Sequence, residues 1–162
     1  MASNPNLNPK SKDALKPIEV NAEAALIKTR REWQAIQTKW GVFPPQAYNF
    51  VRDGLFHTSK SVHGDDDTGL SSHAAHDVRH VNGGQLCAGL RDFAILRYGL
   101  LARTVLGSWN IDSTEHFGRV VFSLIDLGIL RRQEEDCFED FIDVYGFEES
   151  FADLASLASQ GE

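Results

Sequence analysis

Histidines and aspartates gather in one stretch of the chain, where they could hold a metal. The histidines are His57, His63, His73, His76 and His80, and the aspartates are Asp65, Asp66, Asp67 and Asp77. If the stretch were helical, His73, His76 and His80 would share one face, and imidazoles so placed can bind one divalent transition metal. No HExxH or paired Glu-x-x-His motif accompanies them. We therefore predict a polar surface loop with no resident metal or cofactor, and keep the three histidines as a metal-binding alternative.

Two other groups have reactive residue types but lack the spacing for chemistry. Ser108, Asp112 and His116 could be written as a hydrolytic triad, but residues so close along a turn do not generally converge, and no nucleophile-elbow motif is present. Asp112 is also needed to cap the helix that follows it. Cys87 and Cys137 lie far apart and form neither a disulfide framework nor a metal motif, so we expect two buried thiols. We predict no catalytic residues and a protein that is not an enzyme.

Charge is divided unevenly along the chain. The net charge is −7, from 16 Lys and Arg against 23 Asp and Glu. All 16 basic residues lie in residues 1–132 with 13 of the acids, so residues 133–162 hold the remaining ten acids and no base. An acidic segment of this kind repels phosphate backbones, or simply keeps an exposed end solvated. No apolar run is long enough for a membrane span and the N-terminus has no signal-peptide core, so we expect a cytoplasmic protein without membrane contact.

The elements that position these residues form one mostly helical domain. We predict a disordered leader over 1–20, a helical domain over 21–158 with a flexible His/Asp-rich loop at 60–79, and a tail at 159–162. Helical periodicity and polar caps indicate helices from Asn21 to Lys39 and from Pro45 to Lys60, separated by Pro44-Pro45. The whole chain is long enough to bury one substantial core.

Capping signals mark the helices of the second half of the chain. Asn82 followed by Gln85 matches a capping box, and Gly99 is a natural stop for the helix that it opens. A further helix is expected over 100–109, ended by Asn110 in the left-handed conformation. A central helix follows from an Asp112 cap, with Glu115 completing a capping box, to Gly128. It is apolar over so wide an arc that it must be covered on more than one side.

Residues 129–145 fit two structures equally well. The spacing of their aromatic residues suits a helix, but an edge strand returning from a turn at 133–136 is also possible, and a last helix is expected over 148–157. Short helices followed by such a hairpin outline a winged helix. We therefore predict a mainly α fold, a compact helical domain with a winged-helix-like core and a possible short β-hairpin.

Four runs within residues 47–151 resemble a conserved hypothetical protein family found largely in planctomycetes and verrucomicrobia. They are AYNFVRDGLFHT, HVNGGQLCAGLRDFAILRYG, LARTVLGSWNIDSTEHFGRVVFSLIDLGIL and EEDCFEDFIDVYGFEESF. The chain departs from the family at Asn82 and Gln85, where Ser and Glu are usual, and at Asn110, where Gly is usual, but each exchange keeps the capping or turn chemistry. The family has no assigned activity, cofactor or site, so the resemblance implies a fold and no chemistry.

Two kinds of partner remain for a protein without catalytic residues. We expect an interaction or adaptor module that binds another protein or a second copy, because aromatic residues alternate with acids after residue 133 and could meet a basic partner. The alternative is nucleic-acid binding or regulation of the winged-helix type. It is disfavoured because the outward positions of the central helix hold one base, Arg119, beside Glu115 and Asp126.

Overall fold

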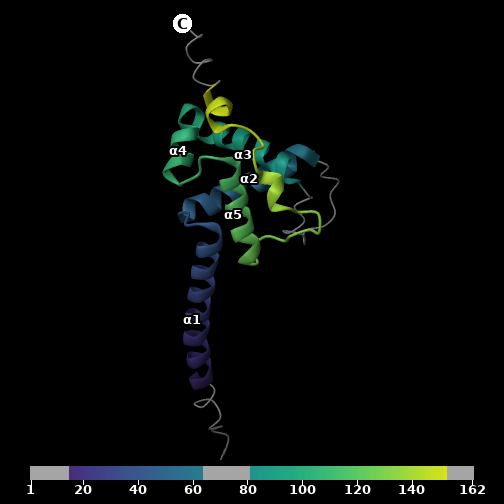
Figure 1. Ribbon diagram of the computed structural model, residues 1–162. Coiled ribbons are helices and arrows are strands. Elements are labelled where there is room, and N and C mark those ends of the chain that lie inside the picture. The colour runs from purple at the N-terminus through teal and green to yellow at the C-terminus, as the bar shows by residue number, and fades with distance from the viewer. Residues whose placement is uncertain (1–14, 64–80, 153–162) are drawn as a thin grey trace, which may run out of the picture.

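In the computed structural model, residues 15–63 and 81–152 are described, with side chains for 27–62 and 81–152, and their regular secondary structure is helical (Figure 1). In chain order the elements are α1 (Leu15–Trp40), α2 (Pro45–His63), α3 (Gly83–Tyr98), the 3₁₀ helix η2 (Gly99–Leu101), α4 (Ala102–Ser108), α5 (Thr114–Asp126) and the 3₁₀ helix η3 (Phe138–Phe141). Residues 147–152 are also helical. The prediction of a mainly α protein is therefore confirmed. Among these residues, none of the helices combines the length and the apolar character that a membrane crossing requires.

Local capping chemistry sets the ends of α3 and α5. The Asn82 side chain accepts from the Gln85 amide at 2.8 Å and the Gln85 side chain accepts from the Asn82 amide at 3.1 Å, which confirms the predicted capping box. The cap predicted at Asp112 is wrong, because α5 begins one residue later on a Ser113 N-cap. Asp112 instead lies with its carboxylate 2.9 Å from the His116 ring. Asn110 has φ 63°, the left-handed conformation expected of it.

The core lies between α2, α3 and α5. Helix α5 is buried on several sides, as its apolar arc predicts, and Phe117 and Val120 on it are fully enclosed. Leu90 on α3 and Val51 on α2 are also fully buried, and the helices α2 and α3 pack closely because Gly54 and Gly89 lie at their contact. Aromatic side chains from η3 and residues 145–151 close the C-terminal side of this core.

The predicted β-hairpin and winged-helix-like core are wrong for the described residues. No strand occurs in 15–63 or 81–152, and residues 129–137 are turns and irregular chain. Gly128, with φ 73°, reverses the chain after α5, and the amides of Ile129 and Leu130 both donate to the Leu124 carbonyl, at 2.9 and 3.2 Å. These donors close the helix end, so they are not available to a strand ladder.

Three predicted boundaries also move. Helix α1 begins at Leu15, so residues 15–20 are helical rather than part of a disordered leader. Helix α2 continues to His63, into the range predicted as the His/Asp-rich loop, and residues 64–80 lie outside the described part of the chain. The last helix, predicted from Glu148, has its described start at Phe147.

Helix α1 extends away from the rest of the fold. Figure 1 shows its C-terminal end held beside α5 and its remaining length projecting past the C-terminal end of α5. Trp40 joins it to the body, because its ring lies 5.3 Å from the rings of both Phe122 and Phe138 and its indole N–H donates to Asp126 at 2.7 Å. Ile36, one turn earlier, is buried.

Candidate functional site

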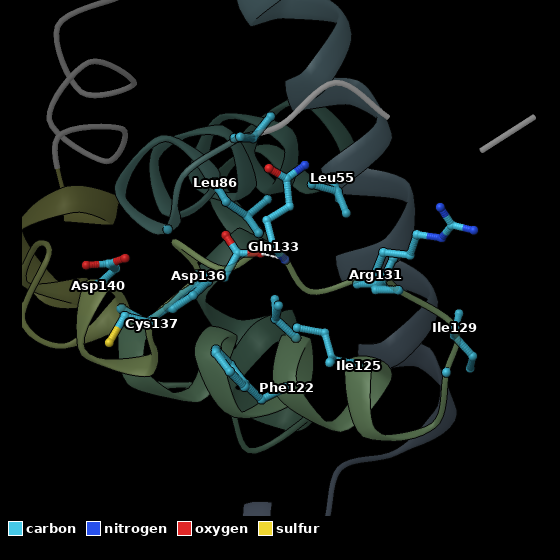
Figure 2. Close-up of a pocket in the computed structure, with 16 residues that line it drawn as sticks. Leu55, Leu86, Phe122, Ile125, Ile129, Arg131, Gln133, Asp136, Cys137 and Asp140 are labelled. Carbon is cyan, nitrogen blue, oxygen red and sulfur yellow. Dashed lines mark hydrogen bonds between the residues drawn. The ribbon is translucent and has the colours of Figure 1, made fainter. Parts of the chain in front are cut away.

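A groove of about 430 Å³ opens where the end of α5 meets the start of α3 (Figure 2). Its floor is apolar and comes from three helices and η3: Leu55, Leu86, Val121, Phe122, Ile125 and Phe141. Its rim is polar and comes from the chain after α5: Arg131, Gln133, Asp136, Cys137 and Asp140. We name this feature the acidic groove. Its size is in the range of protein sites that bind ligands or side chains of a partner.

The rim is built by a turn that its own side chains close. The Gln133 amide donates to the Asp136 carboxylate at 2.8 Å, and the Asp136 amide donates back to the Gln133 carbonyl at 3.1 Å (Figure 2). The guanidinium of Arg132 donates to the Asp136 carbonyl and lies 5.6 Å from the centre of the Phe122 ring. The turn is thereby tied to the end of α5, which places Glu134 and Glu135 at its exposed tip.

The far wall of the groove depends on two glycines. A Cβ at Gly118 would lie 2.7 Å from Cβ of Phe141, and a Cβ at Gly83 would lie 2.8 Å from Cβ of Asp140. Both glycines therefore let η3 approach α5 and α3 more closely than any other residue would permit. Figure 2 shows the result, with Asp140 and Cys137 at one end of the groove and Arg131 at the other.

Carboxylates outnumber cations around the rim: Asp136 and Asp140 line the groove and Glu134 and Glu135 lie at the tip of the turn, against Arg131 and Arg132. Glu134, Glu135 and Asp140 are exposed and form no ion pair within the described residues. The Cys137 thiol donates to Glu139 at 2.6 Å, which raises the pKa of the thiol and lowers the pKa of the Glu139 carboxyl. A thiol held in its protonated form is a poor nucleophile and a poor metal ligand. Cys137 is exposed, so its predicted burial is wrong.

The other cysteine is a core residue, as predicted. Cys87 is fully buried, and burial raises the pKa of its thiol to about 12. Its carbonyl accepts from the Tyr145 hydroxyl at 2.7 Å, which ties the C-terminal chain to α3. Burial likewise raises the pKa of Tyr145. Both groups are therefore held neutral in structural roles.

The reactive groups considered in the sequence do not assemble in the described residues. The metal-binding alternative, His73, His76 and His80, lies outside those residues, and within them no three potential ligands are grouped for a metal. The Ser108 hydroxyl donates to the Val105 carbonyl at 2.6 Å, so it is turned to its own helix and away from the Asp112–His116 pair. The structure therefore pairs Asp112 with His116, and Ser108 forms its hydrogen bond elsewhere.

A shallower hollow of about 290 Å³ lies between α2 and α3 and includes His57, Ser61 and Asp92. The Ser61 hydroxyl donates to the His57 carbonyl at 3.1 Å, and the His57 ring packs on Phe93 with 5.2 Å between ring centres. Each of these two polar groups is therefore engaged within the fold. The acidic groove, with unpaired charge beside an apolar floor, is the better candidate site.

The acidic groove is not predicted by the sequence. The charge division at residue 133 is visible there, but the pattern of residues 129–145 suits a helix and a hairpin alike. The floor residues Leu55, Leu86 and Ile125 come from three separate helices, and their periodicity marks them as apolar without showing which would stay uncovered. The charge division was thus the available signal, and it indicated the rim and not the floor.

Comparison with known proteins adds no relative. No protein-family model, curated protein or solved structure matches this chain. The resemblance to a planctomycete and verrucomicrobial family stays a prediction for this reason. What the fold and the groove define is a small helical domain with an apolar cleft and an acidic rim.

Proposed function

We propose that the protein is a non-enzymatic interaction module whose acidic groove binds a basic, amphipathic helix of a partner protein. The observation that carries this proposal is an apolar floor beside a rim in which carboxylates outnumber cations, with Glu134, Glu135 and Asp140 exposed and outside any ion pair within the described residues. A helix that inserts apolar side chains and places Lys or Arg at the edges satisfies both parts of the groove at once.

The floor supplies the driving force for binding. Ile129, at the open end of the groove, is 55% exposed, and Leu55, Ile125 and Leu130 are only partly buried. Covering such side chains removes apolar surface from water at roughly 25 cal/mol per Å². Burial in a defined cleft also fixes the position of the partner, because few apolar side chains match its shape.

The rim supplies the choice of partner. Asp136, Asp140, Glu134 and Glu135 outnumber the two cations Arg131 and Arg132, so the rim and its turn carry a net negative charge. Such a rim attracts basic segments and repels phosphate backbones. The nucleic-acid alternative also receives little support from α5, where the guanidinium of Arg119 is paired with Glu115 at 2.7 Å.

A labelled synthetic helix tests the proposal. The probe carries Leu at positions i, i+4 and i+7 with Arg on both flanks, and a second probe carries Glu in place of every Arg. Fluorescence anisotropy should show binding of the basic probe that weakens with added salt, and at least about tenfold weaker binding of the acidic probe.

Two matched substitutions locate the binding site. Ile129→Asp adds a charge inside the groove, and Leu96→Asp adds the same charge at a side chain that is 70% exposed on α3 and is not among the groove residues. We expect about tenfold loss of binding for the first and less than about twofold for the second. Equal effects of the two substitutions, or equal binding of both probes, would overturn the proposal.

A further inference from the structure

The exposed part of α1 has the chemistry that the acidic groove requires. Residues 27–32 precede the part of α1 that packs on the body through Ile36 and Trp40. All six are exposed, and Ile27 is 50% exposed. Arg30 and Arg31 form no ion pair within the described residues, and Lys28 makes a loose pair with Glu32 at 3.8 Å. An isoleucine beside two unpaired guanidinium groups on one helix is the combination of apolar and basic side chains that the groove would bind.

The groove of the same molecule does not take up this part of α1. Trp40 and Lys39 fix the end of the helix on Asp126, with donor distances of 2.7 and 3.2 Å. Arg31 lies nine residues earlier, which places it about 13 Å further along the axis at 1.5 Å per residue. Figure 1 shows that this direction leads away from the body of the fold.

We infer that α1 of one copy binds in the acidic groove of a second copy, and that the second copy returns the same contact. This inference rests on the proposed function of the groove and names its partner. The charges are complementary: Arg30 and Arg31 offer two unpaired cations, and Glu134 and Glu135 offer two unpaired carboxylates. A reciprocal exchange closes a two-fold dimer, buries both helices and both grooves, and leaves no unpaired site for further growth.

Charge exchange between the two surfaces tests the inference in the full-length chain. R30E/R31E makes the helix acidic and leaves the rim unchanged, whereas E134K/E135K reverses the charge at the tip of the rim turn and leaves the helix basic. All four side chains are exposed and unpaired in the described residues, so both variants should fold, which circular dichroism checks. Glu149→Lys is the control, because Glu149 is an exposed and unpaired acid in the helical residues 147–152 and not in the rim turn.

Sedimentation velocity at low salt should show a dimer for the wild type and the control, and a dissociation constant at least about tenfold weaker for each double variant alone. An equimolar mixture of the two double variants should form a heterodimer, because both of its contacts again join opposite charges. Native mass spectrometry identifies that species by its mass. A mixture that stays monomeric, or double variants that dimerise as the wild type does, would overturn the inference.

The basic probe distinguishes failure of this inference from failure of the proposed function. In R30E/R31E the groove is intact and vacated, so the probe should bind about tenfold more tightly than to wild type at dimer-forming concentrations. A wild-type monomer that binds the probe overturns self-association and leaves the proposed function standing. A wild-type monomer that binds no probe overturns both.

Discussion

At two contacts of this protein a glycine allows a close approach, and the two contacts differ in the kind of segment that the glycine packs against. At the crossing of α2 and α3, Gly89 faces Thr58, a buried residue in the middle of a regular helix whose hydroxyl donates to the Gly54 carbonyl at 2.7 Å. At the groove, Gly118 faces Phe141 in the 3₁₀ helix η3, which is preceded by irregular chain.

We expect the α2–α3 contact to be rigid and the contact of η3 with α5 to be able to adjust. One residue of a regular helix cannot move without its neighbours, because hydrogen bonds between successive turns couple them. A short 3₁₀ segment has poorer hydrogen bonds and can shift as a unit. The α2–α3 crossing therefore holds the fold, and η3 gives the groove a wall that can follow a partner.

Gly89→Ala should produce the largest effect. The new Cβ would lie 2.7 Å from Cβ of Thr58 and closer still to its Oγ1 and Cγ2, and neither helix can yield cheaply. We expect a loss of about 3 kcal/mol in the free energy of unfolding, measured by urea denaturation with tryptophan fluorescence.

Gly84→Ala, in the same helix, is the matched control. A Cβ there meets the Asn82 side chain at 3.5 Å, an ordinary contact, so stability should change by less than about 0.5 kcal/mol. If both substitutions cost the same, the α2–α3 crossing is not the rigid framework that the comparison requires.

Gly118→Ala should cost less, although the predicted clash is similar. The Cβ would lie 2.7 and 2.8 Å from Cβ and Cγ of Phe141, but η3 can move outward. We expect a loss of about 1 to 2 kcal/mol, with faster amide hydrogen exchange confined to residues 137–145. Gly107→Ala, where a Cβ meets nothing within 4 Å, is the control and should leave this exchange unchanged. A loss equal to that of Gly89→Ala would show that η3 is as rigid as α2.

The sequence predicts the helices better than the groove wall, because helix ends depend on neighbouring residues and the wall depends on residues far apart in the chain. Asn82, Gln85, Gly99 and Asn110 act through hydrogen bonds or backbone angles within a few residues, and each was predicted in its observed role. Ser113 displaced Asp112 as the cap because either side chain can accept from the first turn.

The wall depends on contacts that are distant along the chain. The Tyr145 hydroxyl reaches the Cys87 carbonyl, and Phe141 reaches Gly118, and neither partner is marked in the local pattern of residues 129–145. That pattern suits a helix and a strand alike, so tertiary contacts choose between them and select an irregular chain. The sequence therefore predicts that residues 133–162 are acidic, but it does not predict the apolar groove beside them.

The C-terminal end of α1 is held against α5 by a different kind of contact, the hydrogen bonds from Trp40 and Lys39 to Asp126, and this polar contact should respond to pH. The Trp40 indole N–H lowers the pKa of the Asp126 carboxyl below its ordinary value; burial opposes this with the next-largest effect, and Lys39 and Arg132 lower the pKa further. Because the pKa is lowered in the folded state, the stabilisation is complete above the ordinary pKa of about 3.9 and is lost as the pH falls through the lowered value.

Asp126→Asn should therefore have the smallest effect of the three and should be visible only when the carboxylate is charged. We expect a loss of about 1 kcal/mol at neutral pH, because the site is partly exposed and solvent screens it, shrinking toward zero below the folded pKa. Urea denaturation across the pH range measures the difference between the two proteins. In a Trp40→Phe background the same substitution should cost less, because the strongest donor is already gone. A cost that is independent of pH would mean that the charge of Asp126 does not stabilise the contact between α1 and α5.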